Sequence, residues 1–284
     1  MRVPLGGGTS GRMRDMAIEG VLPPQPRDYA GVNWLGFYTL YMKEVRRFTK
    51  IPMQTVLAPV MTSLLYILIF SVATQGARPP VNGVQFTEFV APGLVMMTVL
   101  NNAFANTSSS LLQAKMMGLS ADFLTPPLNS VEQSLAFVLG GATRGIVVGL
   151  VTVATVWPFA HAHLAHPWAA VWFMFAASMI MSQLGVLAGL WADKFDHMAM
   201  IQNFVIMPLT FLSGTFYTAN ALPEPFRTIS HFNPMFYLID GFRYGFIGVA
   251  DANVWIGVTG SFALTVALMA WCWYLFWTGY RLKT

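Results

Sequence analysis

Long apolar runs separated by short polar connections make up most of this chain. Six runs have about 20 residues, the length that an α-helix needs to cross a hydrocarbon layer of about 30 Å. Their apolar residues occupy every side of a helix, whereas a helix at the surface of a soluble protein is apolar along one stripe. The pattern predicts an all-α polytopic membrane protein with six transmembrane helices. The predicted spans are residues 53–75, 89–112, 133–159, 168–191, 198–218 and 254–279.

The composition agrees with this class. Hydrophobic residues make up 55% of the 284 residues and charged residues 10%, against about 25% charged residues in a typical soluble domain. The net charge is +4, but the basic residues flank the apolar runs, so we expect membrane lipid and not nucleic acid as their partner. Cys272 is the only cysteine of the sequence, which leaves no intrachain disulfide.

The polar beginning of the chain has two parts. Residues 1–32 are rich in glycine and proline, and we expect a disordered cytoplasmic tail. Residues 33–50 have the pattern of an amphipathic helix in the membrane interface, and packing against a soluble partner is the alternative. One stripe holds Trp34, Phe37, Tyr38, Tyr41, Val45 and Phe48, and the other side, expected to meet anionic lipid, holds Lys43, Arg46, Arg47 and Lys50. Residues 51–280 then form the transmembrane domain.

The basic residues also predict the orientation in the membrane. If the N-terminus is cytoplasmic, twelve of the 16 Lys and Arg residues fall on the cytoplasmic side and three on the other side, while Arg144 lies within the third span. Positive residues are enriched in cytoplasmic connections. The distribution therefore predicts that both termini are cytoplasmic.

The longer cytoplasmic connection, residues 112–132, predicts a short helix across the membrane plane. Pro126 and Pro127 would end this helix, and Asn129 or Ser130 would cap the third span. A plain linker is the weaker alternative, because the segment has an apolar face that could dock on a partner. That face contains Met116, Met117, Leu119, Phe123 and Leu124.

The connection before the last span contains the stretch NPMFYLIDGFRYGFIG, residues 233–248. Asn233 as N-cap and Pro234 in the first turn predict a helix over residues 234–247, about 21 Å long and too short to cross the membrane. We expect it to form a re-entrant hairpin or to lie flat at the outer surface, held in depth by aromatic residues such as Tyr237. Asp240 and Arg243 are three residues apart and can form an ion pair, either as a structural clasp or as a contact to substrate.

Two further polar features lie inside predicted spans. Arg144 is followed and preceded by glycines at 140, 141, 145 and 149, which allow close helix packing beside it. It either extends toward the interface or lines a water-filled path. The second span carries a polar strip with Asn101 and Asn102, which suits helix contacts or a transport path.

We expect no metal, cofactor or catalytic group on this chain. His161, His163 and His166 lie in a short turn that has no acidic or thiol ligand nearby. No Ser/His/Asp set or carboxylate pair gathers at one membrane surface. The sequence contains no Gly-x-x-x-x-Gly-Lys-Ser/Thr motif, so ATP would be bound and hydrolysed by a separate chain.

These residues resemble the ABC-2 type permeases, the membrane subunits of bacterial ATP-driven exporters. The resemblance covers roughly residues 33–280 and rests on the amphipathic helix, the segment AKMMGLSADFLTPPLNSVEQ with GGATRG, and the motif FNPMFYLIDGFRYGFIG. The N-terminal tail is a departure from the family pattern, and the gate region has no large insertion that could form an external domain.

The resemblance implies an exporter subunit in the bacterial inner membrane that works as a homodimer with an ABC ATPase subunit. It implies a coupling segment at residues 112–132, where we assign Met117, Phe123 and Leu124 to ATPase docking. It also implies a re-entrant outer gate, where we assign Asp240, Arg243 and Tyr237. Asn101, Asn102 and Arg144 are possible pathway residues for an amphipathic substrate, either drug-like, a lipid or a lipid-linked glycan. An ion-coupled secondary transporter is the alternative function.

Overall fold

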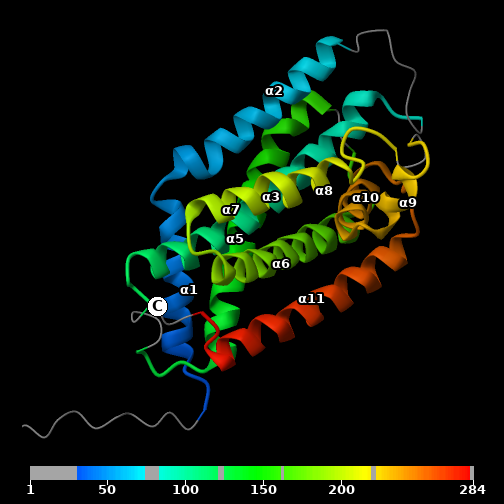
Figure 1. Ribbon diagram of the computed structural model, residues 1–284. Coiled ribbons are helices and arrows are strands. Elements are labelled where there is room, and N and C mark those ends of the chain that lie inside the picture. Colours follow the sequence, from blue (N-terminus) through cyan, green and yellow to red (C-terminus); the bar gives the residue numbers. More distant parts are fainter. Residues whose placement is uncertain (1–30, 74–82, 121–124, 161–162, 219–221, 282–284) are drawn as a thin grey trace, which may run out of the picture. The chain divides into compact units, whose positions relative to one another are not determined.

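The computed structural model describes residues 31–73, 83–120, 125–160, 163–218 and 222–281. It divides at Val32, and the unit that begins at Asn33 contains every helix described below (Figure 1). The first helices in chain order are α1 (Trp34–Thr49), the π-helix η1 (Met53–Leu57), α2 (Ala58–Ala73), α3 (Phe86–Met116), α5 (Ser130–Ala160) and α6 (Pro167–Trp191). They are followed by α7 (Phe195–Ile201), the π-helix η2 (Gln202–Ile206), α8 (Met207–Phe211), α9 (Phe226–Phe232), α10 (Pro234–Ile247) and α11 (Val254–Thr278).

Five helices in the described part of the chain are long and apolar enough to cross a membrane. They confirm an all-helical membrane protein and agree with five of the six predicted spans. They are Met53–Val72, Phe86–Met116, Ser130–Phe159, Pro167–Trp191 and Val254–Thr278.

The remaining predicted span, residues 198–218, differs from the observed helix. Consecutive pieces α7, η2 and α8 have 7, 5 and 5 residues, and the helix ends at Phe211. Gly214 lies in the turn that follows, with φ of +76° in the left-handed region that favours glycine. The prediction was too long because apolar residues such as Phe216 continue past this turn. The helical stretch measures about 25 Å, near the lower limit for a span.

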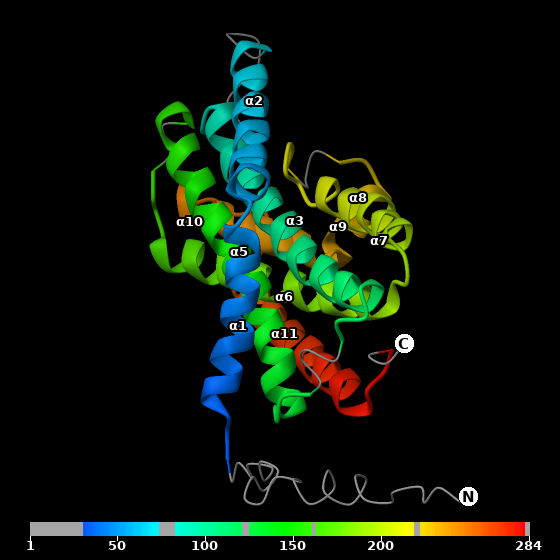
Figure 2. The same cartoon turned by 90° about the vertical axis from the view of Figure 1, so that its left-hand side faces the viewer.

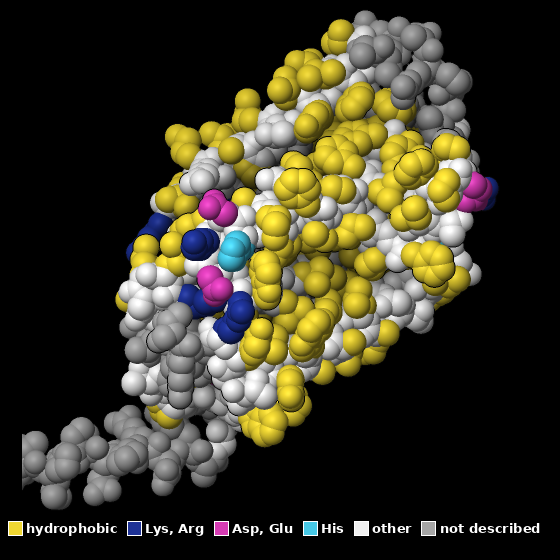
Figure 3. All heavy atoms as spheres, viewed as in Figure 1, with side chains coloured by type: hydrophobic (Ala, Val, Ile, Leu, Met, Phe, Trp, Pro, Cys, Tyr) yellow, Lys and Arg dark blue, Asp and Glu magenta, His cyan; other side chains and the backbone are white. Residues whose placement is uncertain are grey.

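The surface of this unit has polar ends and an apolar middle. Figure 3 shows charged side chains at the end where α7 begins and α11 ends, and again beside α9 at the opposite end. Apolar side chains cover the surface between them. This distribution is the one expected of a protein whose middle faces lipid.

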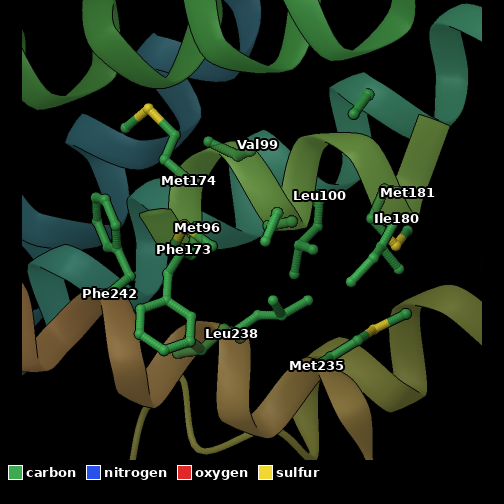
Figure 4. Packing of buried hydrophobic residues seen from close by; sticks show 14 of the residues in the cluster. Met96, Val99, Leu100, Phe173, Met174, Ile180, Met181, Met235, Leu238 and Phe242 are labelled. Atoms are coloured by element: carbon green, nitrogen blue, oxygen red, sulfur yellow. The ribbon is translucent and has the colours of Figure 1, made fainter. Parts of the chain in front are cut away.

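Helices α3 and α6 form the centre of the fold. In the most apolar stretch of each of these two helices, 83% of the residues are buried. The corresponding share is 22% for the span that contains α2 and 17% for α11. The main core lies between α3, α6 and α10, where Met96, Phe173, Leu238 and Phe242 pack together (Figure 4). Helices α2 and α11 are therefore peripheral and present apolar faces outward.

Small residues bring the central helices into contact. A Cβ atom added to Gly185 of α6 would lie 2.5 Å from the carbonyl oxygen of Phe104 in α3. Thr107 Oγ1 donates to the Ser182 carbonyl oxygen at 2.8 Å across the same contact. Gly145 of α5 also has room for hydrogen only, because an added Cβ would lie 2.9 Å from Ala103 Cβ of α3 and 3.0 Å from Ser178 Oγ of α6. The predicted packing role of the glycines near Arg144 is therefore confirmed.

Helix α10 has the predicted boundaries 234–247. Asn233 Oδ1 accepts from the Met235 N–H, and Gly248 ends the helix in the left-handed conformation. Helix α10 packs on α3, α6 and α11, and with α9 it lies at the end of the unit where α6 and α11 begin (Figure 1). The depth of α9 and α10 in a membrane, and hence the re-entrant hairpin, stays a prediction.

The prediction of a separate short helix within residues 112–132 is wrong for residues 112–120. Residues 112–116 belong to the end of α3, which continues to Met116, and residues 117–120 form a turn. Residues 125–129 are irregular, and residues 121–124 lie outside the described part of the chain. The apolar run therefore extends α3 because no helix-breaking residue occurs before Gly118.

The predicted amphipathic helix is present as α1, but its basic side does not face outward throughout. Helix α1 runs parallel to the beginning of α5: Tyr41 Oη lies 2.9 Å from Thr143 Oγ1, and Glu44 packs against Gly140. Arg47, which was expected to meet lipid, turns inward and bonds to α3. Its position three residues after Glu44 places it on the packed side of the helix.

Candidate translocation and coupling sites

The buried Arg243 links α10 to two other segments. Its guanidinium lies 3.9 Å from the centre of the Phe89 ring of α3. Nε donates to the Phe89 carbonyl oxygen at 3.3 Å, and Nη2 donates to the Gly214 carbonyl oxygen at 2.5 Å. Only 1% of the residue is exposed. Arg243 thus fixes α10 against α3 and the turn after α8.

Asp240 provides the opposite charge and holds the connection to α11. Its Oδ1 lies 3.8 Å from Arg243 Nη1, which is an ion-pair distance but too long for a hydrogen bond. Its carboxylate accepts from the Asp251 N–H at 3.0 and 3.1 Å and from the Ala252 N–H at 3.0 Å. The predicted ion pair is present, and its contacts are those of a clasp between α10 and its neighbours.

Tyr237, the third predicted gate residue, lines a cavity of about 220 Å³. The cavity lies between α6, α9, α10 and α11 and is mostly apolar. Its wall includes Phe232, Pro234, Leu238, Ile256, Gly260 and Leu264. Tyr237 therefore lies near the clasp in sequence but faces a different set of helices.

The predicted pathway residues Asn101 and Asn102 point to different neighbours. Asn101 Oδ1 accepts from Gln202 Nε2 at 2.6 Å, which ties α3 to η2. Asn102 Oδ1 accepts from Arg144 Nη2 at 3.1 Å, which ties α3 to α5. The structure therefore brings Asn102 and Arg144 together in a contact between helices, and their role in a transport path stays a prediction.

One stripe of α3 stays partly exposed along much of its length, although most of the helix is buried. Figure 2 shows α3 between α2 and α5 on one side and α7 and α8 on the other. The stripe repeats every four residues and becomes polar toward the end of the helix. It consists of Met97, Asn101, Ala105, Ser109 and Gln113.

A second polar cluster joins α1 to this region. Arg47 Nη2 donates to both oxygens of Asn106, the carbonyl at 2.5 Å and Oδ1 at 3.0 Å, and Nη1 donates to Ser109 Oγ at 3.1 Å. Arg47 Nε lies 3.3 Å from the buried carboxylate of Glu44, which accepts from Ser110 Oγ at 2.7 Å. The sequence analysis missed this cluster. Two features of the sequence could have indicated it: the run of polar residues in the second span, and Glu44 as the acidic residue of a helix that is otherwise basic and aromatic.

At the charged end, Lys115 joins the end of α3 to the end of α6. Its ammonium donates to the carbonyl oxygens of Leu190 at 2.8 Å and Ala192 at 2.6 Å and lies 3.4 Å from Asp193 Oδ1. Arg281 completes the group by donating to the Trp191 carbonyl oxygen at 2.6 Å. Cations are favourable at a helix C-terminus, where carbonyl oxygens have no partner within the helix. The sequence analysis used Lys115 only for orientation.

The predicted coupling residues are only partly described. Met117 directly follows α3 and is 67% exposed, and its role in docking stays a prediction. Phe123 and Leu124 lie outside the described residues. Of the three histidines, His161 also lies outside them, while His166 stacks on Tyr244 with ring centres 4.4 Å apart.

Comparison with known proteins agrees with this architecture. The sequence profile described as ABC-2 type transporter matches residues 36–247. The inner membrane transport permease YadH of Escherichia coli (strain K12) is 34% identical over 255 residues, which cover 88% of this chain and 98% of YadH. Nodulation protein J of Rhizobium leguminosarum bv. viciae is 23% identical over 232 residues, covering 79% of this chain and 86% of that protein.

The matched region contains α3, the polar strip, Arg144 and the Asp240–Arg243 clasp. Both the profile and the similarity to YadH extend over most of the chain. The chain is therefore a membrane transport permease that belongs to the ABC-2 type transporter family.

Proposed function

We propose that this chain is the transmembrane subunit of an ATP-driven exporter and that two copies enclose the path. The observation that carries this proposal is the stripe of α3 that is partly exposed and turns polar between α2 and α8. A polar stripe on a membrane helix is costly against lipid and favourable against water or another polar wall. The stripe thus supports a water-accessible path along α3.

The packing of a single copy supports a path between two copies. The described helices α3, α6 and α10 fill their shared interior with closely packed apolar side chains. A two-fold arrangement would face the stripe of one copy with the same stripe of the other, because a two-fold interface pairs identical surfaces. The path would then be polar on both walls, while α11 and the outer side of α2 face lipid.

The proposed orientation has six crossings, with both termini in the cytoplasm. The segment formed by α7, η2 and α8 supplies the sixth crossing. The charged end with Lys115 and Arg281 is then cytoplasmic, and α9 and α10 form the outer gate. The excess of Lys and Arg on the side of the N-terminus supports this orientation.

Energy would come from a separate ABC ATPase subunit that docks on the segment after α3. Exposed Met117 lies two residues after Lys115, whose ammonium holds the end of α6. A push on this segment would therefore reach α6 and the start of α7 as a rigid-body movement. We assign Met117, Phe123 and Leu124 to docking and propose that no cofactor binds this chain.

The test is ATP hydrolysis by the reconstituted pair. A candidate ABC ATPase from the same organism is purified alone and together with this chain in proteoliposomes, and ATP hydrolysis is measured with and without amphipathic test substrates. We expect the two subunits to purify together and the permease to change the ATPase rate. Phe123→Asp should abolish this effect and leave membrane insertion intact. If no ATPase associates with the chain and an ion gradient alone drives transport, the ion-coupled carrier replaces this proposal.

A further inference from the structure

Arg144 lies in the middle of the apolar helix α5 and has no counter-charge among the described residues. The ion pairs among the described residues use other cations. Its Nη2 donates to Asn102 Oδ1 at 3.1 Å, but its buried Nε has no acceptor. Removing a charge from water is costly unless hydrogen bonds and an opposite charge compensate it. Arg144 therefore lacks a hydrogen-bond acceptor for Nε and an opposite charge that would offset the cost of its burial.

A second unused donor lies one helical turn away. Asn106 is fully buried, and its Oδ1 accepts from Arg47, but its Nδ2 has no acceptor. Asn102 and Asn106 are four residues apart, so their side chains are neighbours on one face of α3. They bring the guanidinium groups of Arg47 and Arg144 onto adjacent turns, where the two cations repel each other. Glu44 is the carboxylate in this group and pairs with Arg47.

The cluster thus combines an excess positive charge with unsatisfied N–H donors. Guanidinium groups present their N–H donors in a fixed planar fork that matches the oxygens of phosphates and carboxylates. We propose that Arg47, Asn106 and Arg144 form a binding site for the oxyanion, a phosphate or carboxylate, of an amphipathic substrate. This inference rests on the proposed function and specifies the substrate class.

The surroundings of the site fit the apolar part of such a molecule. Arg47 precedes the first span by six residues, so it reaches the site from the α1 side of that span. Helix α2 and the end of η1, which follow Arg47 in the chain, carry three apolar side chains at helical spacing that are about half exposed: Leu57, Met61 and Leu65. An anionic head group could accept hydrogen bonds from Arg144, while an acyl chain along α2 would contact apolar side chains.

Binding of decyl phosphate tests the site in the full-length chain, purified in maltoside micelles, which contain no phosphate. Titration calorimetry compares decyl phosphate with inorganic phosphate, which lacks the chain, and with decyltrimethylammonium, which has the opposite charge. We expect only decyl phosphate to bind. Arg144→Gln should weaken its binding about tenfold or more, as expected for loss of a charge-assisted contact. The matched control, Arg46→Gln, removes a cation from the exposed side of α1 and should bind normally.

A second variant keeps the test decisive if Arg144→Gln fails to fold. Asn106→Asp retains the Oδ1 acceptor for Arg47 but replaces the unused donor by a negative charge, so it should also lose decyl phosphate. Equal binding by Asn106→Asp and the unchanged chain overturns the site. Equal binding of decyltrimethylammonium or inorganic phosphate overturns the substrate class. Because the measurement needs no ATPase, its result is independent of the test of the proposed function.

Discussion

At the scale of single residues, Arg243 has the most demanding environment in the described part of the chain. It is a nearly fully buried cation that contacts a ring, two carbonyl oxygens and a carboxylate from segments distant in sequence. Removing one member of such a group leaves the others without partners in an apolar surrounding. Its stability role can therefore be tested separately from any role in gating.

We expect Arg243→Met to lower the free energy of unfolding by about 3–5 kcal/mol, because it leaves the Asp240 carboxylate and two carbonyl oxygens poorly compensated. Arg243→Lys should lose a large part of the same energy, since an ammonium cannot reproduce the planar fork. Thermal unfolding in detergent measures both effects. Lys43→Met removes a cation from the exposed side of α1 and serves as control. An unfolding temperature of Arg243→Met equal to that of the control would show that the clasp contributes no stability.

At the scale of helices, the contacts of α3 decide the architecture. It packs against α6 and α5 through glycines, and its end is joined to α6 by Lys115. These contacts make α3 the element that connects the proposed coupling segment to the core. Packing and coupling can be perturbed separately, because Gly185 lies within α6 and Lys115 lies in the last turn of α3.

Gly185→Ala should destabilise the chain by about 1–3 kcal/mol, because the new methyl group would overlap the backbone of α3 at Phe104. The matched control is Gly260→Ala in α11, where no atom lies within 4 Å of the added methyl group. This control should be neutral or stabilising by up to about 1 kcal/mol, since alanine favours helix more than glycine does. Thermal unfolding of the two variants side by side checks the difference. Equal unfolding temperatures would contradict the close contact of α3 and α6.

Lys115→Met keeps the aliphatic part of the side chain but removes the bonds to the end of α6. Each lost charge-assisted bond is worth about 1.5–3 kcal/mol. We expect the chain to insert in the membrane, while stimulation of the proposed partner ATPase by substrate is lost. Lys194→Met, which removes an exposed cation three residues after the end of α6, should retain this stimulation. Normal stimulation in Lys115→Met would show that α3 and α6 are not coupled through this residue.

At the scale of the whole molecule, the proposed orientation rests on the excess of Lys and Arg on the side of the N-terminus and can be tested by labelling. Cys272 is fully buried, so its replacement by alanine gives a background for cysteine labelling. We expect Thr228→Cys, on the exposed side of α9, to react with a membrane-impermeant maleimide in intact cells. Thr49→Cys, on the exposed side of α1, should react only after permeabilisation. Labelling of Thr228→Cys from the cytosolic side alone would reverse the proposed orientation and remove the outer gate.

The sequence predicted local features well where neighbouring residues determine them. Asn233, Pro234 and Gly248 set the boundaries of α10, and the spacing of Asp240 and Arg243 predicted their ion pair. The end of α8 was missed, because apolar character continues past the turn at Gly214. The inward position of Arg47 was missed too, because a helical wheel does not show which neighbour covers each side.

The sequence by itself determined that this chain is an α-helical membrane protein, because the length and continuity of apolar runs depend only on the order of residues. It also determined the start of α10, because Asn233 caps this helix through a hydrogen bond to the nearby Met235 N–H. The tertiary structure alone decided that Arg243 contacts Phe89, that Lys115 caps α6 and that Arg47 and Arg144 approach one face of α3. These contacts join residues far apart in the chain, and their partners are chosen by which helices pack together in three dimensions.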